Sequence, residues 1–306
     1  MGEIISVRQL TKKYGTLTAV DQISFSVHEG SLFAFLGPNG AGKSTTINVI
    51  CTLLNKTEGE VTVDDLKIGR DDPAIRKKIG VVFQDNVLDD LLTVKENLLS
   101  RGRLYGMTGH ALKQRLEQVA EIMELGDLLN RRYGKLSGGQ RRRTEIGRAL
   151  MSDPKILFLD EPTTGLDPQT RITVWKTIRQ LQKDFNMTVF LTTHYMEEAA
   201  AADWVAIIDG GKIVAEGTPG ELKAKYSSDQ LRLTPIDRPA TETMLSNRKQ
   251  NFERMADQLL IPVKDSLAAL QLLKEIEGSF CDFEVLSGNM DDVFINITGH
   301  KIREDI

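Results

Sequence analysis

The stretch FAFLGPNGAGKSTT, residues 33–46, constrains the fold more than any other part of this chain. A short apolar run leads into a loop that fits the pattern G-x-x-x-x-G-K-[ST], and a helix-forming run follows. The glycines let the loop curl so that its N–H groups point at phosphate oxygens, and the dipole at the helix start also favours an anion. Strand, loop and helix in this order predict an α/β fold that binds a nucleotide.

Each part of this loop has an expected role. We expect Lys43 to reach the β- and γ-phosphates, and the Ser44 hydroxyl to bind Mg²⁺. The predicted phosphate site comprises Gly37, Pro38, Asn39, Gly40, Ala41, Gly42, Lys43, Ser44 and Thr45.

An acidic partner for the metal follows a second apolar run, in KILFLDEPTTGLD. Four apolar residues come directly before Asp160, which places its carboxylate at the sheet edge where ligands bind in α/β folds. Asp160 is the expected Mg²⁺ contact, and the adjacent Glu161 is suited to polarise an attacking water. On these residues alone, Glu161 could instead face solvent at a strand end. The two motifs together predict a hydrolase of a Mg²⁺-bound nucleotide.

Short runs rich in Val, Ile and Phe alternate with segments of helical period through most of the chain. Strands separated by helices indicate an α/β core with a largely parallel sheet. Strands are expected at Ile4–Leu10, Ile23–Val27, Leu32–Leu36, Gly59–Val63, Ile79–Phe83, Ile156–Asp160, Thr188–Thr193, Trp204–Ile208 and Lys212–Ala215. Helices are expected at Lys43–Leu54, Gln169–Lys183 and Tyr195–Ala202.

Residues 93–151 interrupt this alternation and carry only helix signals. Thr93 with Glu96 matches a capping box. An apolar stripe of helical period follows and most simply forms core, at Leu112, Leu116, Val119 and Met123. We therefore expect a helical block, at about residues 86–152, inserted into the α/β core.

A second glycine-rich turn, KLSGGQRRR at residues 135–143, has no lysine placed to clamp a phosphate. Ser137 can cap the following helix with Gln140 three residues later. Gly138 and Gly139 allow close approach of an anion, which the helix dipole favours. Arg141–Arg143 are expected to form a mostly solvated helix face.

LSGGQ, just upstream of LFLDEP, resembles the signature motif of ATP-binding-cassette (ABC) transporter ATPases, and the helical block resembles that family's helical subdomain. The resemblance covers roughly residues 3–225 and implies a P-loop NTPase core with a mixed, largely parallel sheet. In the family, this loop meets the γ-phosphate of ATP held by a second subunit. The residues implied to contact a partner's nucleotide are Ser137, Gly138, Gly139 and Gln140.

Four further residues match the family pattern. Tyr14 resembles the aromatic on which adenine stacks, and Gln84 resembles the glutamine that senses Mg²⁺ and the attacking water and couples to the transport domain. Asp167 resembles the residue that crosses the dimer interface, and His194 resembles the histidine that contacts the γ-phosphate. Taken singly, Tyr14 could be an exposed tyrosine at a strand end, Gln84 a loop glutamine and His194 a structural histidine. The resemblance implies catalytic roles for Glu161, His194 and Gln84, and metal contacts at Ser44, Gln84 and Asp160.

Other stretches resemble drug and antibiotic exporter ATPases that pair with ABC-2-type permeases: NVLDDLLTVKENL, THYMEEA and NMDDVFINITG. This implies ATP hydrolysis that drives export of amphipathic compounds through a separate permease, with a second copy or a paralogue as the other ATPase subunit. An importer subunit is the alternative. A soluble ABC ATPase acting on ribosomes or DNA fits less well, because the chain has one phosphate loop and no room for a coiled coil before LSGGQ. The sequence does not name the cargo.

Near Tyr226 the pattern weakens, and Gly, Pro, Ser and charged residues accumulate. We therefore expect an ATPase domain over residues 1–225 and a small C-terminal α+β domain over residues 226–306. The latter contains a polar stretch and an amphipathic helix around Ser266–Ile276. The implied role of this domain is dimer contact or regulation, and passive stabilisation is the alternative.

The net charge and the hydropathy of the chain limit where the protein can be located and which partners it can bind. The net charge of −4 argues against nonspecific nucleic-acid binding, so no nucleic-acid partner is expected. No apolar run approaches the roughly 18–20 residues needed to cross a bilayer. With no secretory segment at the start, Cys51 and Cys281 are expected to be reduced thiols. The expected location is the cytoplasmic face of the membrane, held there by a permease.

Overall fold

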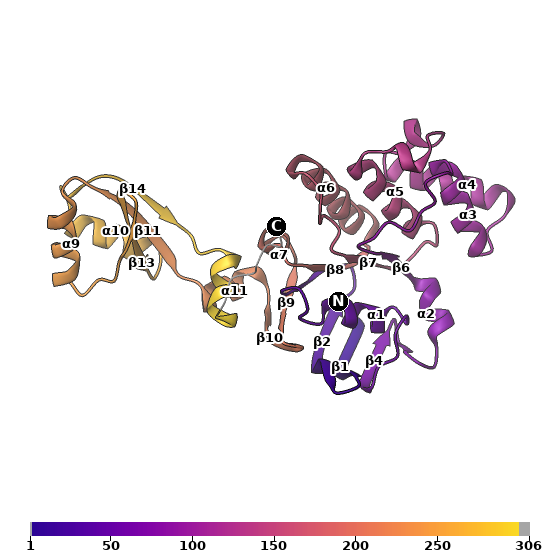
Figure 1. The fold of residues 1–306 in the computed structure, drawn as a ribbon, viewed down its shortest axis with the longest axis horizontal. Coiled ribbons are helices and arrows are strands. Elements are labelled where there is room, and N and C mark those ends of the chain that lie inside the picture. The colour runs from indigo at the N-terminus through magenta and orange to yellow at the C-terminus, as the bar shows by residue number, and fades with distance from the viewer. Residues whose placement is uncertain (1, 300–306) are drawn as a thin grey trace. The chain divides into compact units, whose positions relative to one another are not determined.

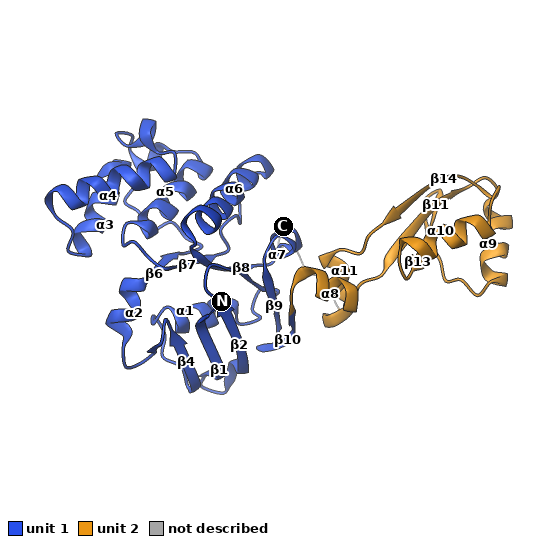
Figure 2. Ribbon diagram, turned by 180° about the vertical axis from the view of Figure 1, so that it is seen from behind, with its two compact units in different colours: residues 1–216, 302–306 blue, residues 217–301 orange. Residues whose placement is uncertain are grey.

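The structure is a computed structural model that describes residues 2–299, and these form two compact units. The first unit ends at Glu216 and the second begins at Gly217 (Figure 2). That these units correspond to separate functional domains stays a prediction.

A six-stranded, largely parallel sheet forms the centre of the first unit (Figure 1). Its strands are β3 (Leu32–Leu36), β6 (Ile79–Val82), β7 (Ile156–Asp160), β8 (Thr188–Thr193), β9 (Trp204–Asp209) and β10 (Lys212–Gly217). They follow the order β10-β9-β3-β8-β7-β6, and the pairs from β9 to β6 run parallel. Every residue of β3, β7 and β8 is buried, as expected for strands covered on both faces. The predicted α/β class is confirmed.

An antiparallel sheet packs beside this centre. Its strands are β1 (Glu3–Tyr14), β2 (Leu17–His28), β4 (Glu58–Val63) and β5 (Leu66–Lys67), in the order β2-β1-β4-β5. Phe25 of β2 stacks on Phe33 of β3 with ring centroids 5.4 Å apart, and Phe33 lies 5.0 Å from Phe190 of β8. These aromatic pairs join the two sheets in one apolar core, because each ring buries a large area and aligns with its neighbour.

Helix α1 (Lys43–Ile50) contacts β2, β7 and β8 and therefore lies in this core. The sequence predicted that it would continue to Leu54, which is wrong. Thr52 adopts a left-handed backbone with φ of 60°, and this conformation ends the helix. Two other helices cover the central sheet: α6 (Pro168–Phe185), which contacts β8, and α7 (Met196–Ala200), which contacts β3 and β8.

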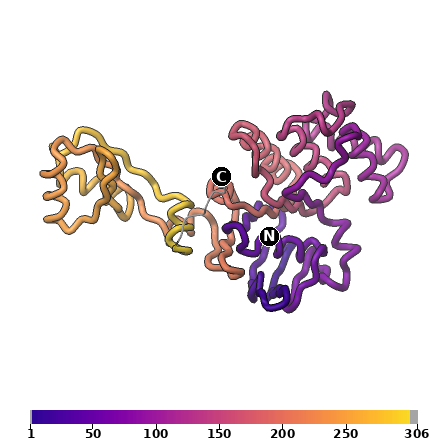
Figure 3. Tube along the Cα trace, viewed as in Figure 1, coloured from indigo at the N-terminus to yellow at the C-terminus, as the bar shows by residue number. Residues whose placement is uncertain are grey.

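A helical group fills the interval between β6 and β7. It contains α3 (Val94–Leu104), α4 (Gly109–Ile122), 3₁₀ turns at Gly126–Leu128 and Tyr133–Lys135, and α5 (Gly138–Leu150); α2 (Asp72–Lys78) precedes β6. Thr93 and Glu96 form the predicted capping box of α3, and the predicted apolar stripe is buried. Figure 1 shows α3–α6 on one side of the central sheet and β1, β2 and β4 on the other. The trace in Figure 3 shows the chain leaving β6, passing through this group and returning at β7.

The second unit is an α+β fold. After α8 (Pro219–Tyr226) come β11 (Asp229–Pro235), α9 (Arg238–Asn247), β12 (Glu253–Met255), β13 (Gln258–Val263), α10 (Ser266–Glu275), β14 (Phe280–Leu286) and α11 (Met290–Thr298). Strands β11–β14 form an antiparallel sheet in the order β12-β13-β11-β14, and α9 and α10 give the β-α-β-β-α-β order of ferredoxin-like folds. Helix α8 contacts α11 in the same unit.

The core of this unit lies between the sheet and its helices. Leu231 and Leu233 of β11 are fully buried, and they form one apolar cluster with Leu245 of α9 and Leu273 of α10. Within residues 2–299, strand β14 pairs only with β11, and its other edge is open. Asp282, Phe283 and Glu284 are exposed along it.

Within residues 2–299, no helix combines the length and apolar character needed to cross a membrane.

Candidate nucleotide site

The loop between β3 and α1 has the shape that its glycines allow. Gly42 has φ of 106°, and a Cβ placed there would lie 2.6 Å from the carbonyl oxygen of Ala19. A Cβ on Gly37 would lie 2.4 Å from the carbonyl oxygen of Ile208 in β9. The loop therefore needs glycine at both positions to turn sharply and to pack on its neighbours.

Lys43 is the first residue of α1, and its side chain is buried, with 5% exposure. Its ammonium donates to the carbonyl oxygens of Gly37 and Pro38, at 2.8 and 3.2 Å. It also lies 3.3 Å from Oε1 of Glu161. Burial lowers the pKa of Lys43, and the Glu161 carboxylate opposes this by stabilising the charged form. The loop thus wraps around the ammonium group of Lys43.

Ser44, the residue after Lys43, lies close to Asp160 at the end of β7. The Ser44 hydroxyl lies 3.4 Å from Oδ1 of Asp160, and Thr192 of β8 donates to the same oxygen. A hydroxyl and a carboxylate are hard oxygen donors of the kind that Mg²⁺ prefers beside substrate phosphates. The two side chains fit the proposed metal contact, although no cluster of three or more His, Cys, Asp or Glu suited to a metal occurs within residues 2–299.

Glu161 does not face solvent, so the alternative reading of this residue is wrong. It is 9% exposed and has a left-handed backbone with φ of 45°. Its Oε2 accepts a hydrogen bond from Thr164 at 3.1 Å and lies 3.3 Å from Nδ1 of His194. Burial opposes ionisation, but the adjacent His194 and Lys43 outweigh it and lower the pKa of Glu161 to about 2.

His194 follows β8, and its side chain is 14% exposed. The helix behind it, α7, is anchored by a buried carboxylate on Glu198. This carboxylate accepts hydrogen bonds from the Thr163 hydroxyl and from the Trp175 indole of α6. The segment after Glu161 and the segment after His194 are therefore tied to one another.

Tyr14 and Gln84 lie on exposed parts of the first unit. Tyr14 ends β1 and is 47% exposed, with the Lys12 ammonium 4.9 Å from its ring centroid. Gln84 follows β6 and is exposed. An exposed ring face can accept an adenine, so the geometry of Tyr14 is compatible with its predicted role.

The LSGGQ segment begins α5 with the predicted capping box. The Gln140 side chain accepts from the Ser137 N–H at 3.1 Å, and the Gln140 N–H donates to the Ser137 hydroxyl at 3.4 Å. A Cβ on Gly139 would lie 2.4 Å from Cγ2 of Thr170, so this turn packs against the start of α6. Asp167 caps α6 by accepting from the Thr170 N–H at 3.0 Å.

The predicted site residues thus form two groups. Lys43, Ser44, Asp160, Glu161 and His194 are joined by contacts of 3.3–3.4 Å. The LSGGQ segment lies with Asp167 at the starts of α5 and α6. The Lys43 ammonium contacts Gly37, Pro38 and Glu161, and the Ser44 hydroxyl contacts Asp160; none of these partners belongs to the LSGGQ segment. The chain therefore presents a phosphate loop and, separately, the exposed Ser137 and Gly138 of the LSGGQ segment.

The expectation that Arg142 lies on a solvated helix face is wrong. Arg142 is 5% exposed, and burial lowers its pKa to about 10. The sequence contains a signal for this burial, because Arg142 shares helical spacing with the buried Glu145, Ile146 and Ala149. Thr192 was also missed as a site residue; it lies opposite Asp160 in the pairing of β7 with β8.

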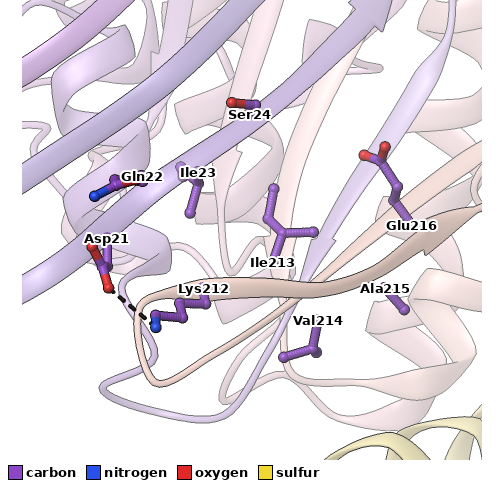
Figure 4. Close-up of a pocket in the computed structure, with 9 residues that line it drawn as sticks. All are labelled: Asp21, Gln22, Ile23, Ser24, Lys212, Ile213, Val214, Ala215 and Glu216. Atoms are coloured by element: carbon purple, nitrogen blue, oxygen red, sulfur yellow. Dashed lines mark ion pairs between the residues drawn. The ribbon is translucent and has the colours of Figure 1, made fainter.

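A separate groove of about 540 Å³ lies between β2 and β10 (Figure 4). Asp21 and Lys212 form an ion pair of 3.3 Å across it. Its lining includes none of the residues predicted to bind nucleotide.

Comparison with protein families finds a match between residues 20–164 and the ABC transporter family model. The daunorubicin/doxorubicin resistance ATP-binding protein DrrA of Streptomyces peucetius is 37% identical, over 97% of this chain and 92% of that protein. The linearmycin resistance ATP-binding protein LnrL of Bacillus subtilis is 36% identical, over 98% of this chain and 100% of that protein. The Nod factor export ATP-binding protein I of Ralstonia nicotianae is 35% identical, over 98% of this chain and 95% of that protein.

Solved structures show the same fold. CbiO1 of Clostridium perfringens, part of an ABC transporter complex, superimposes with a TM-score of 0.69 at 28% identity, over 74% of this chain and 92% of that chain. A dimeric ATP-binding cassette in a post-hydrolysis state, bound to ADP and Pi, gives a TM-score of 0.63 at 31% identity, over 70% of this chain and 98% of that chain.

Proposed function

Since the chain belongs to the ABC transporter family and is an ATP-hydrolysing transporter subunit, we propose that it drives export of drugs, antibiotics or similar amphipathic compounds. One observation carries this proposal. Relatives named for drug resistance or Nod factor export are 35–37% identical over 97–98% of the chain, so the similarity includes the C-terminal unit as well as the ATPase motifs.

The nucleotide roles follow from the group around Lys43. Lys43 binds the β- and γ-phosphates, and the N–H groups of the loop from Gly37 to Thr45 surround them. Tyr14 stacks on adenine. Ser44, Asp160 and Gln84 are the proposed ligands of Mg²⁺, which supplies positive charge to the phosphates when bound.

Glu161 is the proposed base. Its carboxylate is ionised, and its left-handed backbone presents it beside Lys43 and His194. Arrival of ATP gives Lys43 a new anionic partner in place of Glu161. The released carboxylate then accepts a proton from the attacking water, while His194 contacts the γ-phosphate.

A second ATPase subunit completes each site. Ser137 and Gly138 of the LSGGQ segment are exposed, Gly139 and Gln140 are partly exposed, and the Lys43 and Ser44 side chains contact none of them. We infer that Ser137, Gly138, Gly139 and Gln140, with Asp167, face the nucleotide of a second copy or a paralogue. The closing and opening of this pair drives an ABC-2-type permease at the cytoplasmic face of the membrane. Residues 226–306 are proposed to act in dimer contact or regulation.

The test is affinity purification of the tagged chain from gently solubilised membranes, with copurifying chains identified by mass spectrometry. An untagged strain is the control for nonspecific recovery. We expect a permease and no second ATPase chain for a homodimeric motor, or a permease with a paralogue for a heterodimeric one. Recovery of ribosomal or DNA-bound proteins without a membrane protein would overturn the transport proposal. Copurification with an external solute-binding protein would favour import.

A further inference from the structure

Arg142 of α5 contacts four carbonyl oxygens from two separate segments. Its guanidinium donates to the carbonyls of Phe83 and Pro162, each at 2.6 Å. It also donates to the carbonyls of Asp160 and Glu161, at 3.2 and 3.3 Å. A guanidinium has five N–H donors in a rigid planar fork, so one side chain can hold several acceptors in fixed directions.

Three of these carbonyls belong to the turn that carries Glu161. This residue has φ of 45°, a conformation that non-glycine residues rarely adopt unless their surroundings hold them. Arg142 bonds to the carbonyl of Glu161 and to those on both sides of it. These bonds favour the backbone conformation that points the carboxylate at Lys43 and His194.

The fourth carbonyl belongs to Phe83, directly before Gln84. A second residue of α5 holds the segment that follows: the buried Glu145 accepts from the N–H groups of Val87 and Leu88, at 2.8 and 3.1 Å. The loop containing Gln84 is therefore fixed at both ends by a single helix.

The same helix begins at the LSGGQ segment, with Ser137 as its N-cap. Arg142 lies five residues later, about 7.5 Å along the axis of a rigid helix. A displacement of the LSGGQ segment would thus carry the guanidinium, and the carbonyls bonded to it, along with the helix.

We propose that Arg142 is a positioning residue that sets Glu161 and Gln84 according to the position of the LSGGQ helix. A partner's nucleotide that engages Ser137 thereby aligns the hydrolytic residues of the same chain. This inference rests on the roles proposed above for Glu161, Gln84 and the LSGGQ segment, and it goes beyond them by assigning the connection between the two sites of a dimer.

The first experiment compares Arg142→Lys and Arg142→Gln with Arg143→Lys and Arg143→Gln in the full-length chain. Arg143 is the matched control, because it is the adjacent arginine of α5 and bonds instead to Glu124 at 3.0 Å. We expect the Kd for ATP to stay within about twofold in all four variants, since neither arginine contacts the phosphate loop. We expect kcat to fall at least about tenfold in Arg142→Gln, less in Arg142→Lys, and at most about twofold in the Arg143 variants.

A purely structural role for Arg142 would give a different result. In that case the melting temperature would fall while kcat, expressed per molecule able to bind ATP, stayed at the wild-type value, and the proposal would be overturned. Arg142→Lys keeps a buried cation and a donor, so it provides this comparison if Arg142→Gln does not fold.

A double-mutant cycle tests the connection to the LSGGQ segment. If Arg142 transmits the engagement of Ser137, then Arg142→Lys and Ser137→Ala should reduce kcat less together than the product of their separate effects. Independent, multiplicative effects would contradict the transmission. Glu161→Gln is measured in parallel: normal turnover there would refute the proposed base, whereas loss of turnover there with normal Arg142 variants would refute this inference alone.

Discussion

The ammonium of Lys43 and the carboxylate of Glu161 form a buried ion pair, with Nζ 3.3 Å from Oε1 and side-chain exposures of 5% and 8%. The predicted phosphate clamp and the predicted base thus neutralise one another. Neither charge is left unpaired in the interior, where an isolated charge is costly. Binding of ATP must exchange this pair for contacts with phosphate.

Replacing Glu161 with Gln is expected to separate binding from hydrolysis. The amide keeps the shape of the side chain but accepts no proton, so kcat should fall by about 10²–10⁴-fold while ATP still binds. Steady-state ATPase rates and equilibrium nucleotide binding provide the measurement, and Glu121→Gln, on the exposed face of α4, is the control. Near-normal turnover in Glu161→Gln would remove this residue from the role of base.

The same carboxylate makes stability depend on acid pH. Lys43 and His194 lower the folded-state pKa of Glu161 to about 2 from an ordinary value of 4.5. The contribution is therefore complete above about pH 5 and disappears as the pH falls toward 2, because the unfolded chain binds the proton first. It amounts to roughly 3 kcal/mol.

Denaturant unfolding of the nucleotide-free chain at pH 5 and at pH 3 measures this loss. The decrease in unfolding free energy between the two pH values should be smaller in Glu161→Gln than in the wild type. Equal decreases in both proteins would mean that the buried pair contributes nothing to the acid dependence.

Tyr14 is expected to contribute to nucleotide affinity through its exposed ring. Stacking of a base on an aromatic side chain is worth about 1–3 kcal/mol, so Tyr14→Ala should weaken ATP binding by about fivefold or more. Tyr14→Phe keeps the ring and should bind within about twofold of the wild type. Titration with a fluorescent ATP analogue measures both. A Phe variant as weak as the Ala variant would indicate that the hydroxyl, rather than the ring, matters.

Ser137 has a structural role as a helix cap and a proposed functional role, and a capping box elsewhere in the chain allows the two roles to be separated. Thr218 caps α8 with Glu221, as Ser137 caps α5 with Gln140. Ser137→Ala and Thr218→Ala should each cost about 1 kcal/mol of stability. Only Ser137→Ala should lower kcat, with nucleotide affinity of the monomer unchanged. A similar loss of turnover in both variants would trace the effect to helix capping.

The second unit is expected to fold without the first, because it has its own sheet and apolar core. A fragment of residues 217–299 should unfold in one cooperative thermal transition. Leu245→Ala, in the core, should cost about 2–5 kcal/mol, whereas Ile236→Ala, at 66% exposure, should change stability little. A fragment that lacks a cooperative transition would show that the unit needs the first one to fold.

Most of the central fold was accessible from the sequence, because its strands are buried on both faces and its loops carry glycine where the backbone demands it. The strands predicted at Ile156–Asp160 and Thr188–Thr193 have those bounds in the structure. Helix α9 was missed inside a polar stretch. Only Thr241 and Leu245 of that helix are buried, which is too few for a hydrophobic period to register.

The sequence predicts the structural environment of a site residue where that environment depends on neighbouring residues of the same motif. It does not predict the environment where the contacts come from residues far away in the chain. The capping box of Ser137 is local and is confirmed. Arg142 was read as solvated because charged residues are rarely buried, yet its carbonyl partners lie at Phe83 and after β7. These acceptors are backbone carbonyls, whose positions no pattern of side chains in the sequence reveals. The functional roles of the site residues stay predictions.

The open edge of β14 bears on solubility. An unpaired strand edge is a template for association with another copy of the same chain. Two copies of β14 can pair through this edge in antiparallel orientation. In the registers that align most of the strand, Asp282 of one copy lies opposite Glu284 of the other, or one of these acids lies opposite the same residue of the other copy. Like charges in directly opposed positions repel. The acids thus protect an exposed edge from self-aggregation, and replacing both with neutral residues would remove that protection from an otherwise apolar strand.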